Sequence, residues 1–397
     1  MEILKNYKSS FILLGAILLG SLIGNAMGEG AKIFEPIANL FLNLLYCLVV
    51  PMIFISLVSS ITNAQSNSKL GKIIFVMMVI FALSEIIAAL FMLFFTQFYE
   101  VANTYNFGTA SEFSKGNSDF LSMFSVGNFY ELFSRSNLTA LIVFSLIFGV
   151  ALLKLKDTSD IVINFFAQLN EVIVKMVSFV MFFAPLGLGC FFAVLIGTSK
   201  GMVTADLSKA IFVYFIAAII YYFISNFILA YLAGGFSGTK KYFKYIITPT
   251  LVSLGTCSSA ATIPSNLIAG KNIGISDEVK NLVVPFGCNL HKSGAVLITI
   301  LKITFMCSVF GVDLFTFDNL ITAIFVSVLA SSVMGAIPAG GYVGEIFIIS
   351  AFGFPPEAIP VMVLIGTITD APATAINATN DVSAAMLVDK IVNKTKF

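Results

Sequence analysis

Four polar side chains near the C-terminus are spaced so that they could together bind a cation or a small charged molecule. In the apolar stretch GTITDAPATAINATNDVSAAML, Asp370, Thr374, Asn377 and Asp381 follow one another at intervals that place all four on one face of an α-helix. Carboxylate, amide and hydroxyl oxygens suit a hard cation such as sodium, or a ligand's ammonium group. Polar contacts between helices are the alternative, but two acids in one apolar span are costly unless paired, which favours a binding site. Pro372 predicts a local break that frees carbonyl oxygens as further ligands.

A second unusual stretch is PFGCNLHKSG, in the middle of another apolar segment. It holds His291, the only histidine of the chain, directly before Lys292. Glu85 lies in the middle of a third apolar segment, within ALSEIIAAL. Because an unpaired charge inside a bilayer is costly, we expect Glu85 to pair with Lys292. Glu345 and Lys302 lie nearer the ends of their segments, where we expect both side chains to reach the membrane surface.

The composition places these residues in a membrane protein. Of the 397 residues, 58% are hydrophobic and 11% are charged, whereas soluble domains average about 25% charged residues. The formal net charge of +1 gives no indication of a nucleic-acid partner. The cysteines form no CxxC or Cys/His pattern, so no cofactor beyond a coupling ion is expected. The two aspartates share one helix and the single histidine has no nucleophile pattern around it, which argues against an enzyme.

Hydrophobic runs of bilayer length predict an all-α polytopic fold with eight transmembrane helices. They lie near residues 10–28, 38–62, 72–98, 138–155, 165–197, 209–235, 279–305 and 358–388. Lysines concentrate in alternate loops and at both ends of the chain, which predicts two cytoplasmic termini. The first run lacks a clear A-x-A cleavage site, so we interpret it as a transmembrane helix and not as a signal peptide.

Two further apolar stretches, about 245–275 and about 320–352, are broken by small and polar residues. The lysine pattern requires each to enter and leave the membrane on one side, as a re-entrant helical hairpin; kinked helices are the alternative. Glycine and proline in SLGTCSSAATIPSNL and ASSVMGAIPAGGYVG suit such tips. Each hairpin precedes an interrupted polar span, and this arrangement of inverted repeats marks the binding sites of secondary transporters. A channel is a less suitable interpretation, since hairpins that cap a polar helix favour occluded binding.

Several motifs together resemble the dicarboxylate/amino acid:cation symporter family, the glutamate-transporter-like proteins. They are LVVPMIFISLVSSI, FFAPLGLGCFF, TCSSAATIP, GAIPAGG and NATND, in family order over nearly the whole chain. The resemblance implies a homotrimeric elevator-type transporter in the bacterial inner membrane. It implies a scaffold of about residues 1–68 and 138–200, and a transport domain of about 69–98 and 205–397 with the second hairpin as its gate.

The resemblance also implies roles for individual residues. Asp370 would hold the amino group of the substrate, Thr374 its side chain and Asn377 its α-carboxylate. The two hairpin tips and the last span would complete the substrate site with Cys257, Ser258, Ser259, Ala336, Ile337, Pro338, Gly341 and Ala373. A sodium site would be formed by Gly287, Asn377 and Asp381. A second sodium site would be formed by Asn289, Ser331, Ser332 and Met334.

Two departures from the family pattern bear on the substrate and on the coupling ion. Members with acidic substrates carry an arginine at the position of Cys257 or of Ala373, and neither position has one here. Without that bidentate carboxylate clamp, a small neutral amino acid such as serine, threonine or alanine is favoured, with a dicarboxylate or acidic amino acid as the alternative.

The second departure replaces the family's Asn-Met-Asp-Gly by His291, Lys292, Ser293 and Gly294, and puts Glu85 where a small hydroxyl residue is usual. Lys292 then supplies a tethered positive charge in place of sodium, or His291 couples transport to protons, or both only pair with Asp381 or Glu85. Cation symport, with sodium or a proton as the coupling ion, is the main interpretation, and proton-coupled or sodium-independent transport or exchange is the alternative.

Overall fold

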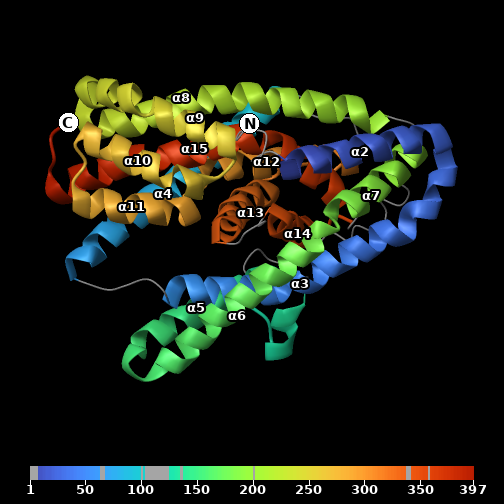
Figure 1. Ribbon diagram of the computed structural model, residues 1–397, viewed down its shortest axis with the longest axis horizontal. Helices are drawn as coiled ribbons and strands as arrows, with labels where there is room; N and C mark the ends of the chain where they lie inside the picture. Colours follow the sequence, from blue (N-terminus) through green and yellow to red (C-terminus); the bar gives the residue numbers. More distant parts are fainter. Residues whose placement is uncertain are drawn as a thin grey trace.

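A computed structural model describes residues 8–62, 68–99, 102, 125–134, 137–199, 202–336, 341–355 and 358–397. Throughout these residues the regular structure is helical, without strands, and the predicted all-α fold class is confirmed (Figure 1). Most of the acidic segment 99–137, with Arg135, lies outside the described residues, as do Ile337 and Pro338 of the second hairpin.

The first half of the chain forms helices that follow the predicted spans closely. They are α2 (Lys8–Met27), η1 (Gly28–Phe34), α3 (Glu35–Thr62), α4 (Ser68–Gln97), η3 (Phe129–Phe133), α5 (Leu138–Lys154), α6 (Lys156–Phe182) and α7 (Ala184–Ser199). The prediction of one continuous fifth span was wrong, because the chain leaves the helix at Phe183, between α6 and α7. Pro185 explains the break, because it has no backbone N–H to donate to the preceding turn and its ring clashes with a carbonyl of that turn.

The second half carries the hairpins and the polar helices. The elements are α8 (Met202–Tyr245), α9 (Ile247–Thr256), α10 (Ser259–Ile273), α11 (Asp277–Leu290), α12 (Ser293–Phe310), α13 (Phe317–Ala336), α14 (Gly341–Phe352) and α15 (Ile359–Asn393). Helices α9 and α10 form hairpin 1, and α13 and α14 form hairpin 2. The seventh span is interrupted between α11 and α12, at His291 and Lys292.

Helix α8 contains a sharp kink at Gly234 and Gly235, where the predicted sixth span ends. Gly235 has φ +59°, a left-handed conformation that glycine adopts at little cost. Beyond the kink the chain packs back on the first part of α8, where the Tyr242 hydroxyl donates to Asn226 Oδ1 at 2.5 Å. The same hydroxyl lies 3.0 Å from the Thr379 carbonyl oxygen, so this polar contact also ties α8 to α15.

The last span is a single helix from Ile359 to Asn393, and the predicted break at Pro372 was wrong. A proline removes one backbone donor, and tight packing of the surrounding turns keeps the helix regular. Nearly every residue from Ala373 to Met386 is buried. Helix α12 is buried over most of its length as well, so α12 and α15 form the centre of the molecule.

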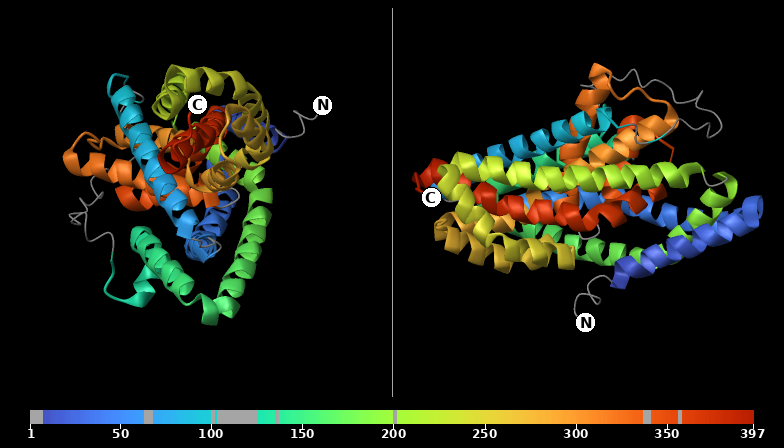
Figure 2. Two further views of the ribbon diagram at one scale, coloured as in Figure 1. Left: turned by 90° about the vertical axis from the view of Figure 1, so that its left-hand side faces the viewer. Right: turned by 90° about the horizontal axis from the view of Figure 1, so that it is seen from above.

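The helices pack in two groups. Helices α2, α3, α5, α6 and α7 contact one another, and α4 and α8 to α15 form the second group around α12 and α15. Figure 1 shows α3, α5 and α6 along one side, with α8 to α11 and α15 along the other, and Figure 2 gives two further views of this arrangement.

Glycines allow α2 and α7 to cross closely. A Cβ on Gly20 would lie 2.0 Å from the Gly189 carbonyl oxygen, and one on Gly24 would lie 2.2 Å from that of Ala193. No side chain larger than hydrogen fits between these backbones. The small-residue contact therefore fixes α2 on α7.

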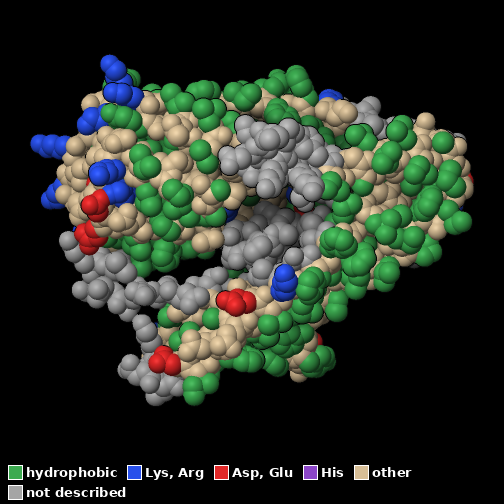
Figure 3. Space-filling model, in the orientation of Figure 1, with side chains coloured by type: hydrophobic (Ala, Val, Ile, Leu, Met, Phe, Trp, Pro, Cys, Tyr) green, Lys and Arg blue, Asp and Glu red, His purple; other side chains and the backbone are tan. Residues whose placement is uncertain are grey.

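Length and composition indicate membrane spans in four places among the described residues. They are Gly71–Gln97, Asp206–Tyr245, Asp277–Phe310 and Ile359–Asn393. Large apolar side chains are exposed along α2, α4 and α8, as expected of helices that face lipid. Figure 3 shows lysine side chains gathered at the end of the molecule that carries the C-terminus, with apolar side chains over much of the remaining visible face.

Candidate functional site

The interruption between α11 and α12 places His291 in the interior of the molecule. Its side chain is fully buried, and its ring stacks on Phe81 of α4 with centroids 4.4 Å apart. Nδ1 lies 3.2 Å from Asp381 Oδ1, and Nε2 lies 3.0 Å from the Ser84 hydroxyl. Ser293 contacts the same nitrogen at 3.4 Å. The imidazole therefore bridges α15 and α4 through hydrogen bonds at both nitrogens.

Sequence reasoning missed Phe81 and Ser84 as partners of this histidine. Ser84 directly precedes Glu85 in α4, and its hydroxyl also lies 3.2 Å from that of Ser293. The Tyr221 hydroxyl donates to the Ser84 carbonyl oxygen at 3.2 Å, so α8 supports the same region. The signal that the sequence offered was the position of Ser84, a polar residue next to the acid Glu85 in the middle of an apolar segment.

Asp381 is packed tightly between His291 and Gly287 of α11. A Cβ on Gly287 would lie 2.3 Å from Asp381 Oδ1, so glycine is required for the carboxylate to reach this position. The third predicted sodium ligand, Asn377, points elsewhere: its Oδ1 accepts the backbone N–H groups of Gly294 at 2.7 Å and Ala295 at 3.3 Å. Asn377 thus satisfies donors at the start of α12, which have no partner within that helix.

These contacts test whether sodium fits the first predicted site. Sodium needs several oxygen ligands directed at one point. Here Asp381 Oδ1 is engaged by the imidazole of His291, and Asn377 Oδ1 by two backbone N–H groups. Among the described side chains no group of three or more His, Cys, Asp and Glu residues is arranged to hold a metal ion. Two of the predicted sodium ligands thus have hydrogen-bond partners within the protein, and the sodium site at Gly287, Asn377 and Asp381 stays a prediction.

Lys292 and Glu85 lie close together in a way that differs from the predicted ion pair. Glu85 Oε1 accepts the backbone N–H of Lys292 at 2.7 Å, and the carboxyl group is almost fully buried. The ammonium group extends to hairpin 1 instead, where Nζ donates to the Ser259 hydroxyl at 3.3 Å. The broken backbone explains the difference, because it turns the side chains of His291 and Lys292 toward different neighbours.

The tip of hairpin 1 approaches the polar face of α15. Cys257, between α9 and α10, has the left-handed φ of +48°, and its side chain lies beside the carboxylate of Asp370. The Thr374 hydroxyl donates to Asp370 Oδ1 at 3.2 Å. Ser258 caps α10, its hydroxyl accepting the Ala261 N–H at 3.2 Å. The structure thus brings together Asp370, Thr374 and the tip that was predicted to complete the substrate site.

The remaining predicted residues are distributed as follows. Ala373 is buried, and its backbone lies against Gly294, where an added Cβ would meet the Ala373 carbonyl oxygen at 2.3 Å. Ser331 is buried, and its hydroxyl donates to the Val328 carbonyl oxygen at 2.7 Å. Asn289 is exposed and donates only weakly to the Pro285 carbonyl oxygen at 3.5 Å. The side chains of Ser332, Met334, Ala336 and Gly341 lie outside the described residues, so the second predicted sodium site stays a prediction.

Lys302 of α12 and Glu345 of α14 form a buried ion pair. The exposed fractions of the two residues are 4% and 1%, so the prediction that both reach the membrane surface was wrong. A Cβ on Gly366 would lie 2.9 Å from Lys302 Nζ, which places the pair against α15. Glu345 Oε2 has no hydrogen-bond partner among the described atoms. The pair joins the second arm of hairpin 2 to α12 and α15.

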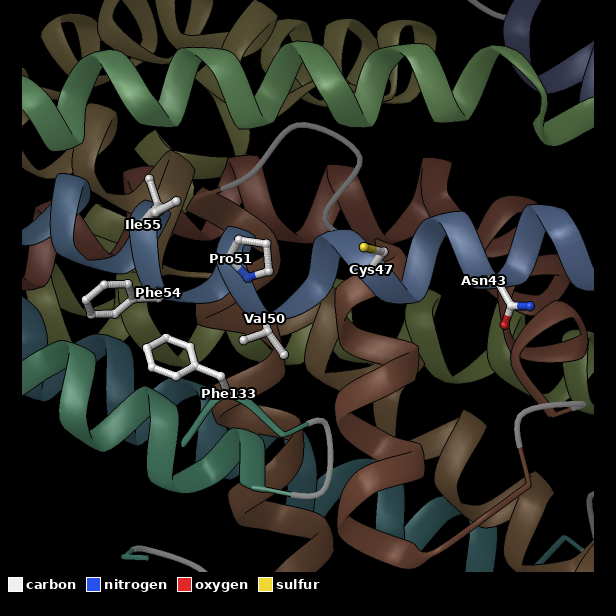
Figure 4. Close-up of a pocket in the computed structure, with 7 residues that line it drawn as sticks. All are labelled: Asn43, Cys47, Val50, Pro51, Phe54, Ile55 and Phe133. Atoms are coloured by element: carbon white, nitrogen blue, oxygen red, sulfur yellow. The ribbon is translucent and has the colours of Figure 1, made fainter. Parts of the chain in front are cut away.

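A separate open hollow of about 680 Å³ lies on α3 (Figure 4). It is lined by Asn43, Cys47, Val50, Pro51, Phe54, Ile55 and Phe133. None of these side chains is charged, and none belongs to the constellation around Asp370 and Asp381. The hollow therefore offers no group that would hold a carboxylate, an ammonium group or a cation through charge.

Comparisons with known proteins agree with this architecture. A family model described as the sodium:dicarboxylate symporter family matches residues 10–391. The C4-dicarboxylate transport protein of Bacillus subtilis (strain 168) is 24% identical over 99% of this chain and 95% of its own length. The proton/sodium-glutamate symport protein of the same organism is 24% identical over 90% of this chain and 85% of its own length.

A neutral amino acid transporter is also similar. The neutral amino acid transporter B(0) of Rattus norvegicus is 29% identical over 66% of this chain and 48% of its own length. The chain thus spans nearly the whole length of the C4-dicarboxylate transport protein but about half the length of the neutral amino acid transporter. The relatives include transporters named for neutral, acidic and dicarboxylate substrates, and all three are named as transport proteins rather than enzymes.

The match from residue 10 to residue 391 includes both hairpins, the interrupted α11–α12 pair and the polar face of α15. This chain is a multi-pass membrane protein that belongs to the sodium:dicarboxylate symporter family.

Proposed function

We propose that the protein is a secondary active transporter that imports a small neutral amino acid, such as serine, threonine or alanine, by cation symport. The contact between Cys257 and Asp370 carries the substrate part of this proposal. A thiol stands at the hairpin tip beside the carboxylate that would hold the substrate's amino group. An uncharged neighbour at this point leaves room for a small side chain and supplies no clamp for a second carboxylate.

Asp370, Thr374 and Asn377 have defined parts in this proposal. The carboxylate of Asp370 would bind the ammonium group of the amino acid, and the Thr374 hydroxyl, which already donates to Asp370, would orient it. The oxygen of Asn377 is engaged by α12, so its amide nitrogen is the end that would donate to a substrate carboxylate. These three residues lie on consecutive turns of α15, which holds them in fixed relation to one another.

The packing of the helices supports an elevator mechanism with hairpin 2 as gate. Helices α4 and α8 to α15 pack together, as a body that moves past α2, α3 and α5 to α7 would require. We infer that the transport domain is about residues 69–98 and 205–397, and the scaffold about 1–68 and 138–200. Rigid-body movement of one bundle against another is a common form of alternating access in secondary transporters. We further infer a homotrimer in the bacterial inner membrane with both termini cytoplasmic.

A second candidate function, sodium-independent transport, is favoured by one specific observation. The imidazole of His291 is buried against Asp381, where a sodium ion was predicted to bind. An internal hydrogen bond at this position reduces the need for a bound cation to keep the carboxylate stable inside the membrane. Coupling to a proton, or exchange without a coupling ion, would then take the place of sodium symport.

Uptake into proteoliposomes tests both candidates. Purified protein is reconstituted, and accumulation of labelled L-serine is measured under an inward sodium gradient, an inward proton gradient or neither. Sodium symport predicts saturable accumulation under the sodium gradient alone; sodium-independent transport predicts accumulation under the proton gradient, or exchange against internal serine without a gradient. Absence of saturable uptake under all conditions would count against the proposed function.

A further inference from the structure

The ammonium group of Lys292 has an unusual environment for a charge in the middle of a membrane protein. The residue is half-buried, and Nζ donates to the Ser259 hydroxyl at 3.3 Å. No carboxylate of the described residues forms an ion pair with this nitrogen. A cation at this depth is costly without a counter-charge in direct contact, and the neutral hydroxyl of Ser259 supplies none.

The acids that surround Lys292 are each held by another donor. Glu85 accepts the backbone N–H of Lys292, and Asp381 contacts the ring of His291. Asp370 interacts with the Thr374 hydroxyl and the Cys257 thiol. The Lys292 ammonium is thus a donor left facing the tip of hairpin 1, with a hydroxyl beside it.

We propose that Lys292 and Ser259 form a subsite for the carboxylate of the substrate, in which the ammonium group of Lys292 makes the charged hydrogen bond. This inference rests on the proposed function for the identity of the substrate. Ser259 is the first residue of α10, so a carboxylate bound to its hydroxyl and to Nζ also lies near the positive end of that helix. A charged pair of this kind binds more strongly than a neutral hydrogen bond.

With this subsite, the pocket has one positive group, the ammonium of Lys292, and one negative group, the carboxylate of Asp370. Lys292 contacts Ser259 at the tip of hairpin 1, and Asp370 lies beside Cys257 of the same tip, so both charged groups face this tip. A zwitterionic amino acid presents an ammonium group to Asp370 and a carboxylate to Lys292, and both charges are compensated. A dicarboxylate would bring its second carboxylate toward Asp370 and be repelled. Lys292 and Asp370 together therefore favour a zwitterion over a dicarboxylate.

Binding measurements on purified full-length protein test the subsite. Isothermal titration calorimetry compares L-serine with L-serine methyl ester, which lacks the carboxylate charge. From the usual strength of charged hydrogen bonds we expect wild type to prefer L-serine by about 10- to 100-fold. Lys292→Met should lose this preference, because its affinity for L-serine falls while that for the ester stays. Equal weakening for both ligands, or no change for either, overturns the proposal.

The matched control is Lys271→Met, which removes an exposed lysine from the other end of α10 and should leave both affinities unchanged. Lys292→Arg keeps the charge and should restore most of the preference. If Lys292→Met aggregates and cannot be measured, the two ligands are compared on wild type alone. Equal affinities of wild type for L-serine and its methyl ester then overturn the proposal.

The failure of the subsite is distinguishable from the failure of the proposed function. The ligand panel also contains L-alanine, L-aspartate and succinate. If wild type binds succinate and not L-serine, the proposed neutral amino acid function is wrong. The subsite is then tested by comparing succinate with its monomethyl ester in Lys292→Met and Lys292→Arg. Failure of every carboxylate in the panel to bind overturns the subsite as well.

Discussion

Nδ1 of His291 lies 3.2 Å from Oδ1 of Asp381, and this contact joins the interruption between α11 and α12 to the centre of α15. Both residues are buried, with exposed fractions of 0% and 1%. A buried carboxylate in a membrane protein needs a partner. For Asp381 that partner is the imidazole of His291.

The variant His291→Asn should make stability depend on sodium. The substitution removes the imidazole that engages Asp381 and introduces the amide oxygen that the family has at this position. A cation that binds only the folded protein raises Tm by mass action. We expect Tm of the variant to rise more in sodium chloride, relative to choline chloride, than Tm of wild type does.

Ser84→Ala is the control for this comparison, since it removes the other hydrogen bond of the imidazole and leaves His291 against Asp381. It should lower Tm equally in both salts. An equal rise of Tm in sodium chloride for wild type and for His291→Asn would show that His291 does not replace the ion.

Removing one member of the Lys302–Glu345 pair should destabilise the protein strongly. Lys302→Met leaves the Glu345 carboxylate buried without its cation, and such changes cost about 3–5 kcal/mol. The double variant Lys302→Met/Glu345→Met replaces both charges by apolar side chains and should recover most of that loss. Thermal unfolding in detergent measures both effects.

The exposed pair Lys32–Glu29, at 3.0 Å, provides the comparison. Lys32→Met should change stability by less than about 1 kcal/mol, because exposed ion pairs contribute little. If Lys302→Met proves equally mild, the charges of the buried pair have another partner or access to water.

Periodicity predicted the polar face of α15 but not the partners of its residues. Asp370, Thr374, Asn377 and Asp381 share one side of a regular helix, which a repeat of 3.6 residues makes visible. Their contacts come from three other elements: hairpin 1, the start of α12, and the ring of His291. Such contacts between distant parts of the chain leave no local pattern.

The errors have the same physical origin. Lys302 and Glu345 were interpreted from their places in their own segments, whereas packing of α14 on α12 and α15 brings them together. The ammonium group of Lys292 was expected to pair with Glu85. Because the helix is interrupted at this point, Glu85 accepts the backbone N–H of Lys292 instead. Pro372 was expected to break a helix that its buried surroundings keep intact.

An arginine introduced at Cys257 should change the substrate preference. Cys257 is partly exposed at the hairpin tip and contacts Asp370, so a guanidinium there has space and faces the pocket. We expect Cys257→Arg to bind L-aspartate more tightly and L-serine less tightly, through a bidentate carboxylate contact. Competition binding on the purified variant measures the shift.

Ala373→Arg, the other family position, should instead fail to fold. Ala373 is 2% exposed and its backbone lies against Gly294. A stable Ala373→Arg variant with a preference for L-aspartate would contradict the packing around α15.

The close crossing of α2 and α7 should be sensitive to one methyl group. Gly24→Ala puts a Cβ 2.2 Å from the Ala193 carbonyl oxygen and should cost about 1–3 kcal/mol of stability. Gly15→Ala on the same helix meets nothing within 4 Å and should be neutral, or stabilising by up to about 1 kcal/mol. Equal Tm values for the two variants would mean that the helices cross elsewhere.

The most direct test of the proposed substrate class is competition for L-serine uptake. Reconstituted protein takes up labelled L-serine in the presence of excess unlabelled L-alanine, L-threonine, L-aspartate or succinate. The account predicts that L-alanine and L-threonine abolish uptake, while L-aspartate and succinate leave it nearly unchanged, because a pocket with Asp370 and without an arginine admits zwitterions. Strong inhibition by L-aspartate or succinate, with none by L-alanine, would contradict it.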